Sequence, residues 1–314
     1  MLISNKRIIL SGSAGFIGNE MTRQILAKNP SDFVTIDKMS YMSDDTFHIA
    51  NNIPVHKIDI CSISASELIA EFKPDIIIHA AAESSVDVSI SDPDLFVRSN
   101  VFGTTNLLNA AIKLTNMPLF VNIGTDEVYG DKLSGSSIES DPRMASSPYS
   151  ASKAAAELFV ESYGRTYNLP YLMTRSSNNY GPYQHHEKLI PRIIQNILAG
   201  RKIPVYGAGN QSRDWITSSD NCEGIISAIE HYSGNDVFNV GGVKDTTNLE
   251  IIRRICHIMN VDYNDFIEFV PDRKGHDMRY NIDCSKIKAH TGWIPKTSLD
   301  DGLRTTVESY KSRQ

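Results

Sequence analysis

Tyr149 and Lys153 are residues whose types and spacing suggest a reaction. They lie four positions apart in a segment with a helical pattern, so both side chains fall on one face of the helix. A phenol is a poor base at neutral pH because its pKa is near 10. A nearby ammonium group and a positively charged cofactor would lower this pKa to about 7, which requires roughly 4 kcal/mol. Tyr149 could then take a hydroxyl proton while hydride leaves the same carbon, although the same pair also occurs by chance in many helices.

Asp126 and Glu127 are adjacent carboxyl groups that follow Thr125, directly after the apolar run Leu119–Ile123. Ligands bind at the carboxyl ends of the strands in a parallel sheet, which places this segment beside a substrate. Two neighbouring carboxyls in different environments can act as acid and base at one pH. A helix cap or a solvent-facing turn is an equally good interpretation of these residues taken alone.

Three glycines, Gly12, Gly15 and Gly18, come after the apolar run Arg7–Leu10, and a helical pattern follows them. Glycines at such a turn let backbone amides approach a pyrophosphate at the positive end of the helix. Asp37 ends the second apolar run, where a carboxylate binds the adenosine ribose and repels a 2′-phosphate. The sequence therefore predicts binding of NAD in preference to NADP, with a simple turn residue as the alternative for Asp37.

Short apolar runs and longer helical patterns alternate through the first half of the chain. This alternation predicts an α/β fold with a Rossmann-like, doubly wound parallel sheet covered by helices. We expect strands at Arg7–Leu10, Phe33–Ile36, Val55–Ile58, Asp75–His79 and Leu119–Ile123. We expect helices at Phe16–Lys28, Ser64–Phe72, Leu95–Leu114, Ser150–Asn168 and Lys188–Leu198.

The second half of the chain is richer in turns. We expect an NAD-binding domain at residues 1–175 and a smaller C-terminal α/β substrate-binding lobe at 176–314, with some segments returning to the first domain. Net charge is −6, so neither nucleic acid nor an anionic membrane is an expected partner. The four cysteines form no CxxC pair and no apolar run is long enough to span a membrane, so the cytoplasm is the expected compartment. His185 and His186 beside Glu187 show no evident third ligand, and we expect no metal.

The glycine spacing and the Tyr-x-x-x-Lys pair match the extended branch of the short-chain dehydrogenase/reductase superfamily. More specific motifs run through nearly the whole chain, and with them the sequence resembles the dTDP-glucose 4,6-dehydratase family. These motifs are HAAAESSVD (79–87), TDEVYG (125–130), SSPYSASKAAAE (146–157), SNNYGPY (177–183), EKLIP (187–191), RDW (213–215), NVGG (239–242) and DRKGHDMRY (272–280).

The resemblance implies a redox-neutral lyase that uses NAD to remove water from a nucleoside-diphosphate hexose. A C4 ketone makes the C5 proton acidic, a base removes it, an acid protonates the departing C6 hydroxyl, and the hydride returns to C6. By the resemblance, Asp126 is the acid, Glu127 the base and Tyr149 the oxidising base, with Thr125 and Lys153 in support.

The resemblance also implies two sets of binding residues. The residues expected to contact NAD are Gly12, Gly15, Phe16, Ile17, Gly18, Asp37, Lys38, Asp59, Ile60, Ala81, Ala82, Ser99, Tyr149, Lys153 and Asn179. Those expected to contact the nucleotide sugar are Ser84, Thr125, Asn178, Glu187, Lys188, Leu189, Arg213, Asn248, Arg273 and His276. A pyrophosphate needs cationic donors in an otherwise acidic protein, which agrees with the lysine and arginines. Pairing with Asp214 is the alternative for Arg213.

Several positions depart from the family pattern. Gly124 stands where the family usually has Ser, Ser85 where it has His, and Lys274 where it has Pro. These departures leave the nucleotide and the hexose open, so a UDP-glucose 4,6-dehydratase is an alternative. A related extended short-chain epimerase or decarboxylase is another, against which the two adjacent carboxyls argue. An NAD-binding protein without activity is a third. The family's homodimers would here be formed through Leu95–Leu114 and Ser150–Asn168.

Overall fold

A seven-stranded parallel sheet forms the centre of the molecule, with strand order β10-β6-β5-β4-β1-β2-β3. The structure is a computed structural model that describes residues 2–272 and 276–313. The strands are β1 (Arg7–Ser11), β2 (Asp32–Asp37), β3 (Val55–Lys57), β4 (Ile76–His79), β5 (Leu119–Thr125), β6 (Tyr171–Ser176) and β10 (Asp236–Val240). All five strands expected in the first half are present, and the predicted Rossmann-like fold is confirmed.

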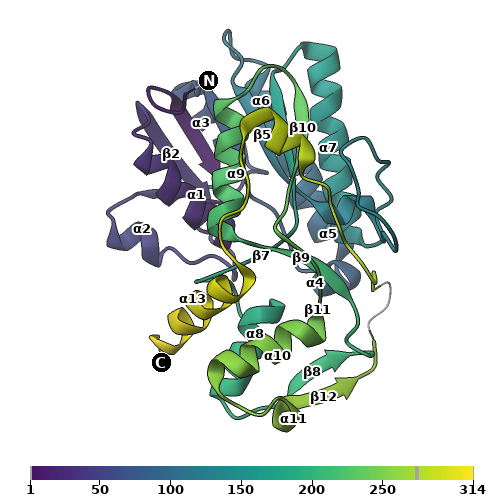
Figure 1. The fold of residues 1–314 in the computed structure, drawn as a ribbon. Helices are drawn as coiled ribbons and strands as arrows, with labels where there is room; N and C mark the ends of the chain where they lie inside the picture. The colour runs from purple at the N-terminus through teal and green to yellow at the C-terminus, as the bar shows by residue number, and fades with distance from the viewer. Residues whose placement is uncertain (1, 273–275, 314) are drawn as a thin grey trace.

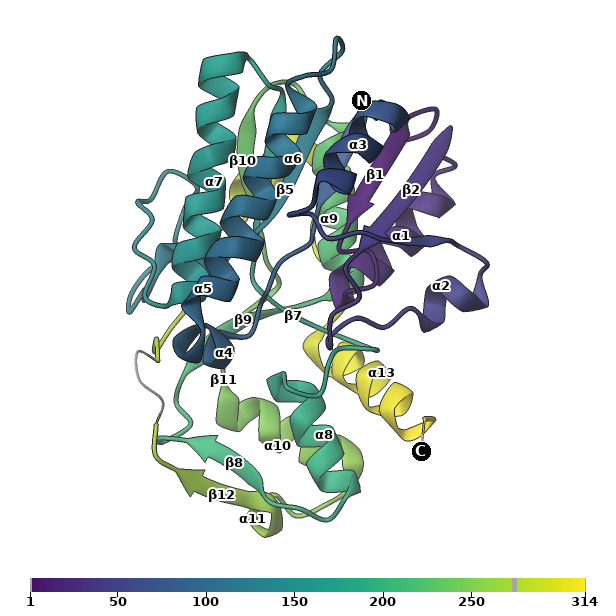
Figure 2. The same cartoon turned by 180° about the vertical axis from the view of Figure 1, so that it is seen from behind.

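Helices cover both faces of this sheet, as Figures 1 and 2 show. Successive side chains of a strand point to opposite faces, so Ile8 and Leu10 join one buried cluster and Ile9 another. The first face is covered by α1 (Phe16–Ala27), α9 (Ser218–Glu230) and α12 (Ser285–Thr291). The second is covered by α3 (Ile63–Phe72), α6 (Gly103–Ala111) and α7 (Pro148–Tyr167).

The helix expected at Leu95–Leu114 is not one regular helix. The chain forms α4 (Val86–Ser91), α5 (Pro93–Phe96), a π-helical segment η1 (Val97–Phe102) and then α6, which ends at Ala111. Asn100, within η1, turns its side-chain amide inward. The amide oxygen accepts from the main-chain N–H of Glu83, and the amide nitrogen donates to the carbonyl of Glu83 and to the hydroxyl of Ser152. A widened turn accommodates this inward polar side chain, and hydrophobic spacing alone does not reveal it.

The second lobe is built on smaller sheets and has its own buried core. Strands β7 (Asn178–Tyr180), β9 (Ser212–Thr217) and β11 (Val243–Thr247) form one sheet, and β8 (Ile203–Tyr206) pairs with β12 (Ile267–Val270). The helices around them are α8 (Leu189–Leu198), α10 (Asn248–Met259), α11 (Tyr263–Phe266) and α13 (Leu299–Lys311). Strand β10 and helix α9 return to the central sheet, so residues after 175 contribute to both parts.

The remaining elements are two short helical segments of the first half. They are α2 (Thr46–Ala50), after β2, and the 3₁₀ turn η2 (Asp126–Tyr129), which follows β5 directly. Across residues 2–272 and 276–313, no helix has the length and apolar character needed to cross a bilayer.

Candidate active site

The glycine-rich turn between β1 and α1 has no room for side chains. Gly12 has φ +74°, and a Cβ there would lie 2.6 Å from the main chain of Ala81. A Cβ on Gly18 would lie 1.9 Å from the Gly12 carbonyl oxygen. The missing side chains let these main-chain segments approach one another closely. Gly15 is the N-cap of α1 and lines the cavity, so the start of the helix is open to a ligand. This arrangement suits a pyrophosphate.

Asp37 is the last residue of β2, and hydrogen bonds from neighbouring residues fix its carboxylate. One oxygen accepts from the amide of Ala14 at 3.1 Å, and the other from the amide of Met39 at 2.8 Å and the hydroxyl of Ser43 at 2.9 Å. The side chain is 7% exposed and lines the same cavity as the glycine turn. It is therefore a fixed acceptor beside the place where the glycine turn would hold a pyrophosphate.

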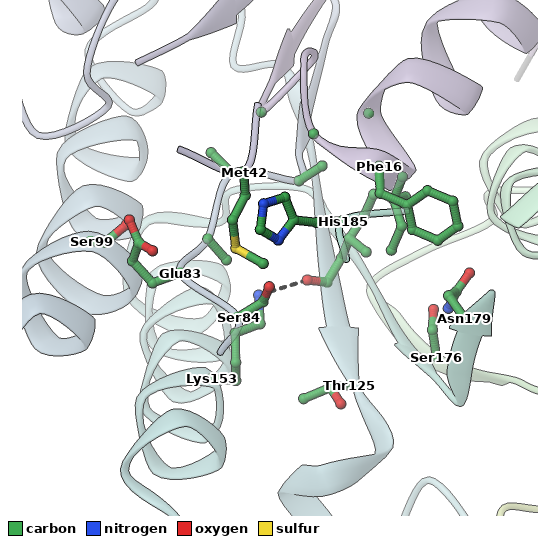
Figure 3. A pocket seen from close by; sticks show the side chains of 18 of the residues that line it. Phe16, Met42, Glu83, Ser84, Ser99, Thr125, Lys153, Ser176, Asn179 and His185 are labelled. Carbon is green, nitrogen blue, oxygen red and sulfur yellow. Dashed lines mark hydrogen bonds between the residues drawn. The ribbon is translucent and has the colours of Figure 1, made fainter. Parts of the chain in front are cut away.

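One elongated cavity brings together most of the residues expected from the sequence (Figure 3). The residues of the two expected binding sets and of the catalytic set that line it are Gly12, Gly15, Phe16, Ile17, Gly18, Asp37, Lys38, Ile60, Ala81, Ala82, Ser84, Ser99, Thr125, Asp126, Glu127, Tyr149, Lys153, Asn178, Asn179 and Lys188. Those that do not line it are Asp59, Glu187, Leu189, Arg213, Asn248 and His276. Arg273 lies outside the described residues.

Thr125, Tyr149 and Lys153 meet where β5 ends and α7 begins. Ser147 caps α7 by accepting from the amide of Ser150 at 3.1 Å, which fixes Tyr149 in the first turn. The side chain of Thr125 lies close enough to Tyr149 to lower the pKa of its phenol. Lys153 is 5% exposed and lines the cavity together with Thr125 and Tyr149.

The pKa of Tyr149 is shifted in the direction opposite to the one expected from its neighbour. Burial raises this pKa above its ordinary value, the negative charge of Glu127 raises it further, and the hydrogen bond from Thr125 opposes both. Lys153 directs its ammonium group at the main-chain carbonyl of Ile123, at 2.8 Å. That Lys153 together with a positively charged cofactor lowers the pKa of Tyr149 stays a prediction.

Asp126 and Glu127 occupy different environments although they are adjacent in sequence. Asp126 is 2% exposed, and its Oδ2 has no hydrogen-bond partner among the described residues. Burial raises its pKa well above the ordinary value, and the charges of Glu127 and Asp214 add to this effect. Glu127 is only partly buried, with its amide donating to the hydroxyl of Thr125 at 3.2 Å. A carboxyl whose protonated form is favoured by burial thus lies beside a more accessible one, as an acid and base pair requires.

Arg213, on β9, lies near this pair, since its positive charge lowers the pKa of Asp126. Its guanidinium group donates to the carbonyls of Asp277 at 2.9 Å and Met278 at 3.3 Å and lies 4.2 Å from the centre of the Tyr280 ring. The alternative pairing with Asp214 is not formed between these two described residues.

A second group of expected binding residues gathers outside the cavity, around the start of β9. Gln211 bonds Asp272 at 3.0 Å and accepts from the amide of Asn248 at 3.0 Å, and Asp272 in turn pairs with His276 at 2.6 Å. Asn248 and His276 are thus connected to one another through Gln211 and Asp272.

The loop before α8 closes one side of the cavity. Lys188 donates to the carbonyl of Ser84 at 2.7 Å, which links the loop to the end of β4. Glu187 instead accepts from the hydroxyl of Tyr41 at 3.2 Å, and the Tyr41 ring lies edge-on to His185. These contacts bring the loop across from the segment that follows β2.

Lys38 pairs with the buried carboxylate of Glu83 on the same wall of the cavity. The main chain of Glu83 is in turn held by Asn100 of η1, at 2.8 and 3.0 Å. This ion pair was not expected from the sequence, because its two members are far apart along the chain.

Several lining residues were missed by the sequence analysis. Ser176 ends β6 and Ser177 follows it, and both hydroxyls are buried without a partner among the described residues. Their position at the carboxyl end of a parallel strand was the signal that could have found them. Met42 and His185 also line the cavity, but they come from loops whose paths no local pattern predicts.

Comparisons with known proteins agree with this geometry. The family model for GDP-mannose 4,6 dehydratase matches residues 9–306. The dTDP-glucose 4,6-dehydratase of Haemophilus influenzae is 41% identical, over 96% of this chain and 97% of its own length. The crystal structure of DesIV, a dTDP-glucose 4,6-dehydratase from Streptomyces venezuelae with NAD bound, has a TM-score of 0.93 and 38% identity, covering 98% of this chain and 97% of that one. The UDP-glucose 4-epimerase of Thermus thermophilus has a TM-score of 0.90 at 27% identity, over 97% and 99% of the two chains.

Proposed function

The chain belongs to the dTDP-glucose 4,6-dehydratase family, and we propose that its cavity converts dTDP-glucose to the dTDP-4-keto-6-deoxy sugar and water. It is an NAD-dependent hydro-lyase of the extended short-chain dehydrogenase/reductase superfamily. The observation that carries the residue roles is the difference in environment between Asp126 and Glu127, beside Thr125 and Tyr149.

The cavity has features that suit NAD. The backbone of the glycine turn is open toward the cavity, and Asp37 is a fixed acceptor that would bind ribose hydroxyls and disfavour a 2′-phosphate. Ser176, Ser177 and Asn179 each have a buried side-chain oxygen without a partner among the described residues. When bound, NAD supplies a reversible acceptor for the hydride of C4 and returns it to C6.

Tyr149 acts first, by taking the proton of the C4 hydroxyl. Its place in the first turn of α7 lies near the positive end of the helix, which favours the phenolate form that accepts this proton. Thr125, which lines the cavity beside Tyr149, orients the reacting hydroxyl. The buried ammonium group of Lys153 adds positive charge to this end of the cavity.

Glu127 and Asp126 then carry out the elimination. Glu127 removes the C5 proton, which the C4 ketone has made acidic. Burial raises the pKa of Asp126 and so favours its protonated form, and Asp126 gives this proton to the departing C6 hydroxyl, which leaves as water. Glu127 returns its proton to C5 when hydride adds at C6, and the proton taken up by Tyr149 replaces, through solvent, the one given up by Asp126. One substrate therefore yields one keto sugar and one water.

The nucleotide-sugar diphosphate would be held at the end of the cavity lined by Ser84 and Lys188. Lys188 is a cationic donor on that wall, which suits an anionic group. Arg213, Asn248 and His276 lie beyond the lining and would complete the nucleotide site. Thymidine is favoured over uridine by the names of the relatives.

We also propose a homodimer. Val97 and Phe102 on η1, with Leu158 and Phe159 on α7, are between 41% and 56% exposed. The elements that carry them pack side by side along one flank of the molecule, as both Figures 1 and 2 show. A contiguous apolar flank of two long helical segments suits a partner with the same surface. The four free thiols are consistent with a reducing compartment, and we propose the cytoplasm.

Mass spectrometry of the products from dTDP-glucose and from UDP-glucose, in separate incubations, tests the function. The proposal predicts loss of one water from dTDP-glucose without net accumulation of reduced cofactor. A faster loss of water from UDP-glucose would support the dehydratase activity but identify uridine as the preferred nucleotide. An isomer of unchanged mass would instead indicate an epimerase.

A further inference from the structure

Arg175 of β6 lies at the centre of a buried cluster that the proposed mechanism does not use. Arg175 is 1% exposed, and it donates hydrogen bonds to the carboxylate of Glu157 from Nη2 at 2.8 Å and from Nε at 3.1 Å. Glu157 is fully buried. A buried ion pair is weak as an argument for stability, because desolvation offsets the attraction. The directions in which the guanidinium group donates suggest another role.

The remaining donors of Arg175 reach a different element. Nη1 donates to the hydroxyl of Tyr129 at 2.8 Å, and the guanidinium carbon lies 4.7 Å from the centre of the Tyr129 ring. Tyr129 is the last residue of η2, the turn that begins with Asp126 and Glu127. Its hydroxyl then donates to Asn239 of β10 at 2.7 Å.

Glu157 connects the same cluster to the oxidising residues. It lies four positions after Lys153 and eight after Tyr149 on α7, so the three share one face of the helix. One guanidinium group therefore bonds both the helix that carries Tyr149 and Lys153 and the turn that carries Asp126 and Glu127.

Gly124 shows how closely these elements approach. It pairs with Arg175 in the register of β5 and β6, and a Cβ at this position would lie 2.9 Å from Oε1 of Glu157 and 2.6 Å from the carbonyl oxygen of Thr174. The carboxylate of Glu157 thus occupies the space that a side chain at 124 would need. A side chain at 124 would collide both with this carboxylate and with the main chain of Thr174.

We propose that Arg175 is a positioning residue that sets the placement of the elimination pair, Asp126 and Glu127, relative to the oxidation pair, Tyr149 and Lys153. This inference rests on the proposed function. Both pairs must reach neighbouring carbons of one bound sugar, and a displacement of about 1 Å can cost on the order of a hundredfold in rate. Helix α7 has further anchors, including its N-terminal cap and Lys153, so loss of Arg175 releases the turn η2 more than the helix.

Arg175→Met tests the proposal, with Arg143→Met as its matched control. Arg143 also bonds Glu157, at 2.7 Å, and it pairs with Glu161. Unlike Arg175, it forms no hydrogen bond with Tyr129 among the described residues. Three quantities would be measured in each holoenzyme: kcat and KM for product, the steady-state fraction of reduced cofactor by absorbance, and thermal stability. In Arg175→Met we expect kcat to fall by about tenfold or more with little change in KM. Reduced cofactor should accumulate because elimination slows more than oxidation, whereas Arg143→Met should keep the wild-type fraction.

Tyr129→Phe carries the test if Arg175→Met does not fold. It removes the hydroxyl that links Arg175 to η2 and leaves the buried ion pair intact. We expect the same accumulation of reduced cofactor in a milder form. An unchanged fraction of reduced cofactor in the folded variant, or equal slowing of both steps, would overturn the inference. Failure of the wild-type protein to dehydrate any nucleotide sugar would instead overturn the proposed function, so the two failures are distinguishable.

Discussion

Lys153 and Ile123 are joined by a hydrogen bond of 2.8 Å, in which the buried ammonium group on α7 donates to a main-chain carbonyl of β5. The bond ties the helix that carries Tyr149 to the strand that ends in Thr125. Burial lowers the pKa of Lys153 to about 8, with Glu157 acting in the opposite direction. The structure therefore holds a charged group where charge is unfavourable, which is typical of a functional site.

Lys153→Met should abolish most activity and alter the dependence of stability on pH. The folded pKa is about 8 and the ordinary value is 10.5, so the unfolded chain binds more protons between these values. Lys153 therefore costs stability below pH 8, on the order of 3 kcal/mol, and the cost disappears as pH rises toward 10.5. Chemical denaturation of both proteins across this range should show the variant's relative advantage shrinking. A constant difference would contradict the burial argument.

Asp126→Asn should remove the acid of the elimination and stabilise the fold. The folded carboxyl binds its proton more tightly than the unfolded one, so wild-type stability falls as pH rises from the ordinary pKa through the raised one. Asparagine has no such dependence, and the variant should gain relative stability over this window. Its kcat should fall by roughly a hundredfold or more. A variant that is both slower and less stable at neutral pH would argue against a protonated Asp126.

Wild-type activity should decline at high pH for the same reason. Asp126 must carry a proton to release the C6 hydroxyl, so turnover falls as pH rises through its raised pKa. Measuring kcat against pH for the wild-type protein and for Asp126→Asn checks this assignment. The descending limb that belongs to Asp126 should be missing from the residual activity of the variant.

Glu127→Gln should separate the two halves of the reaction. Glutamine cannot remove the C5 proton, while Thr125 and Tyr149 remain in place for C4 oxidation. We expect little or no water loss, with a general base worth about a hundredfold or more, and slow formation of reduced cofactor. Single-turnover absorbance together with product mass measures both. Loss of oxidation and elimination to the same extent would point to a role for Glu127 other than base.

Leu158→Glu should convert the proposed dimer to a monomer. A charge placed on the apolar flank of α7 would have to be buried in the interface. Ile49→Glu is the control, because Ile49 is 69% exposed on α2, away from this flank in both views. Sedimentation velocity should show one species of half the mass for the first variant only. A wild-type protein that sediments as a monomer would remove the basis for the dimer.

The sequence predicted the parts of the site that depend on local order. Each of these parts is a short motif of a few consecutive or nearby residues: the glycine turn, Asp37, the carboxyl pair after β5 and the Tyr149–Lys153 pair. The parallel sheet then brings these motifs to one edge. The features it did not predict depend on contacts across long distances in the chain. Arg175 reaches Tyr129 across 46 positions, and no local pattern distinguishes it from other strand residues.

Two features of the structure differ from what residue spacing alone suggests. The break at η1 follows from the inward amide of Asn100, which hydrophobic spacing does not record. The raised pKa of Tyr149 follows from burial and from Glu127, whereas the sequence analysis considered only the neighbouring lysine and the cofactor. Both depend on how deeply a side chain is buried, which spacing alone does not specify.

The most direct test of the central claim uses dTDP-glucose that carries deuterium at C4. Hydride moves from C4 to C6 within one active site in the proposed mechanism, so the product should be lighter than its substrate by one water. It should retain the deuterium, and nuclear magnetic resonance should locate it in the C6 methyl group. Recovery of the labelled sugar unchanged, or of a dehydrated product without the label at C6, would contradict the account.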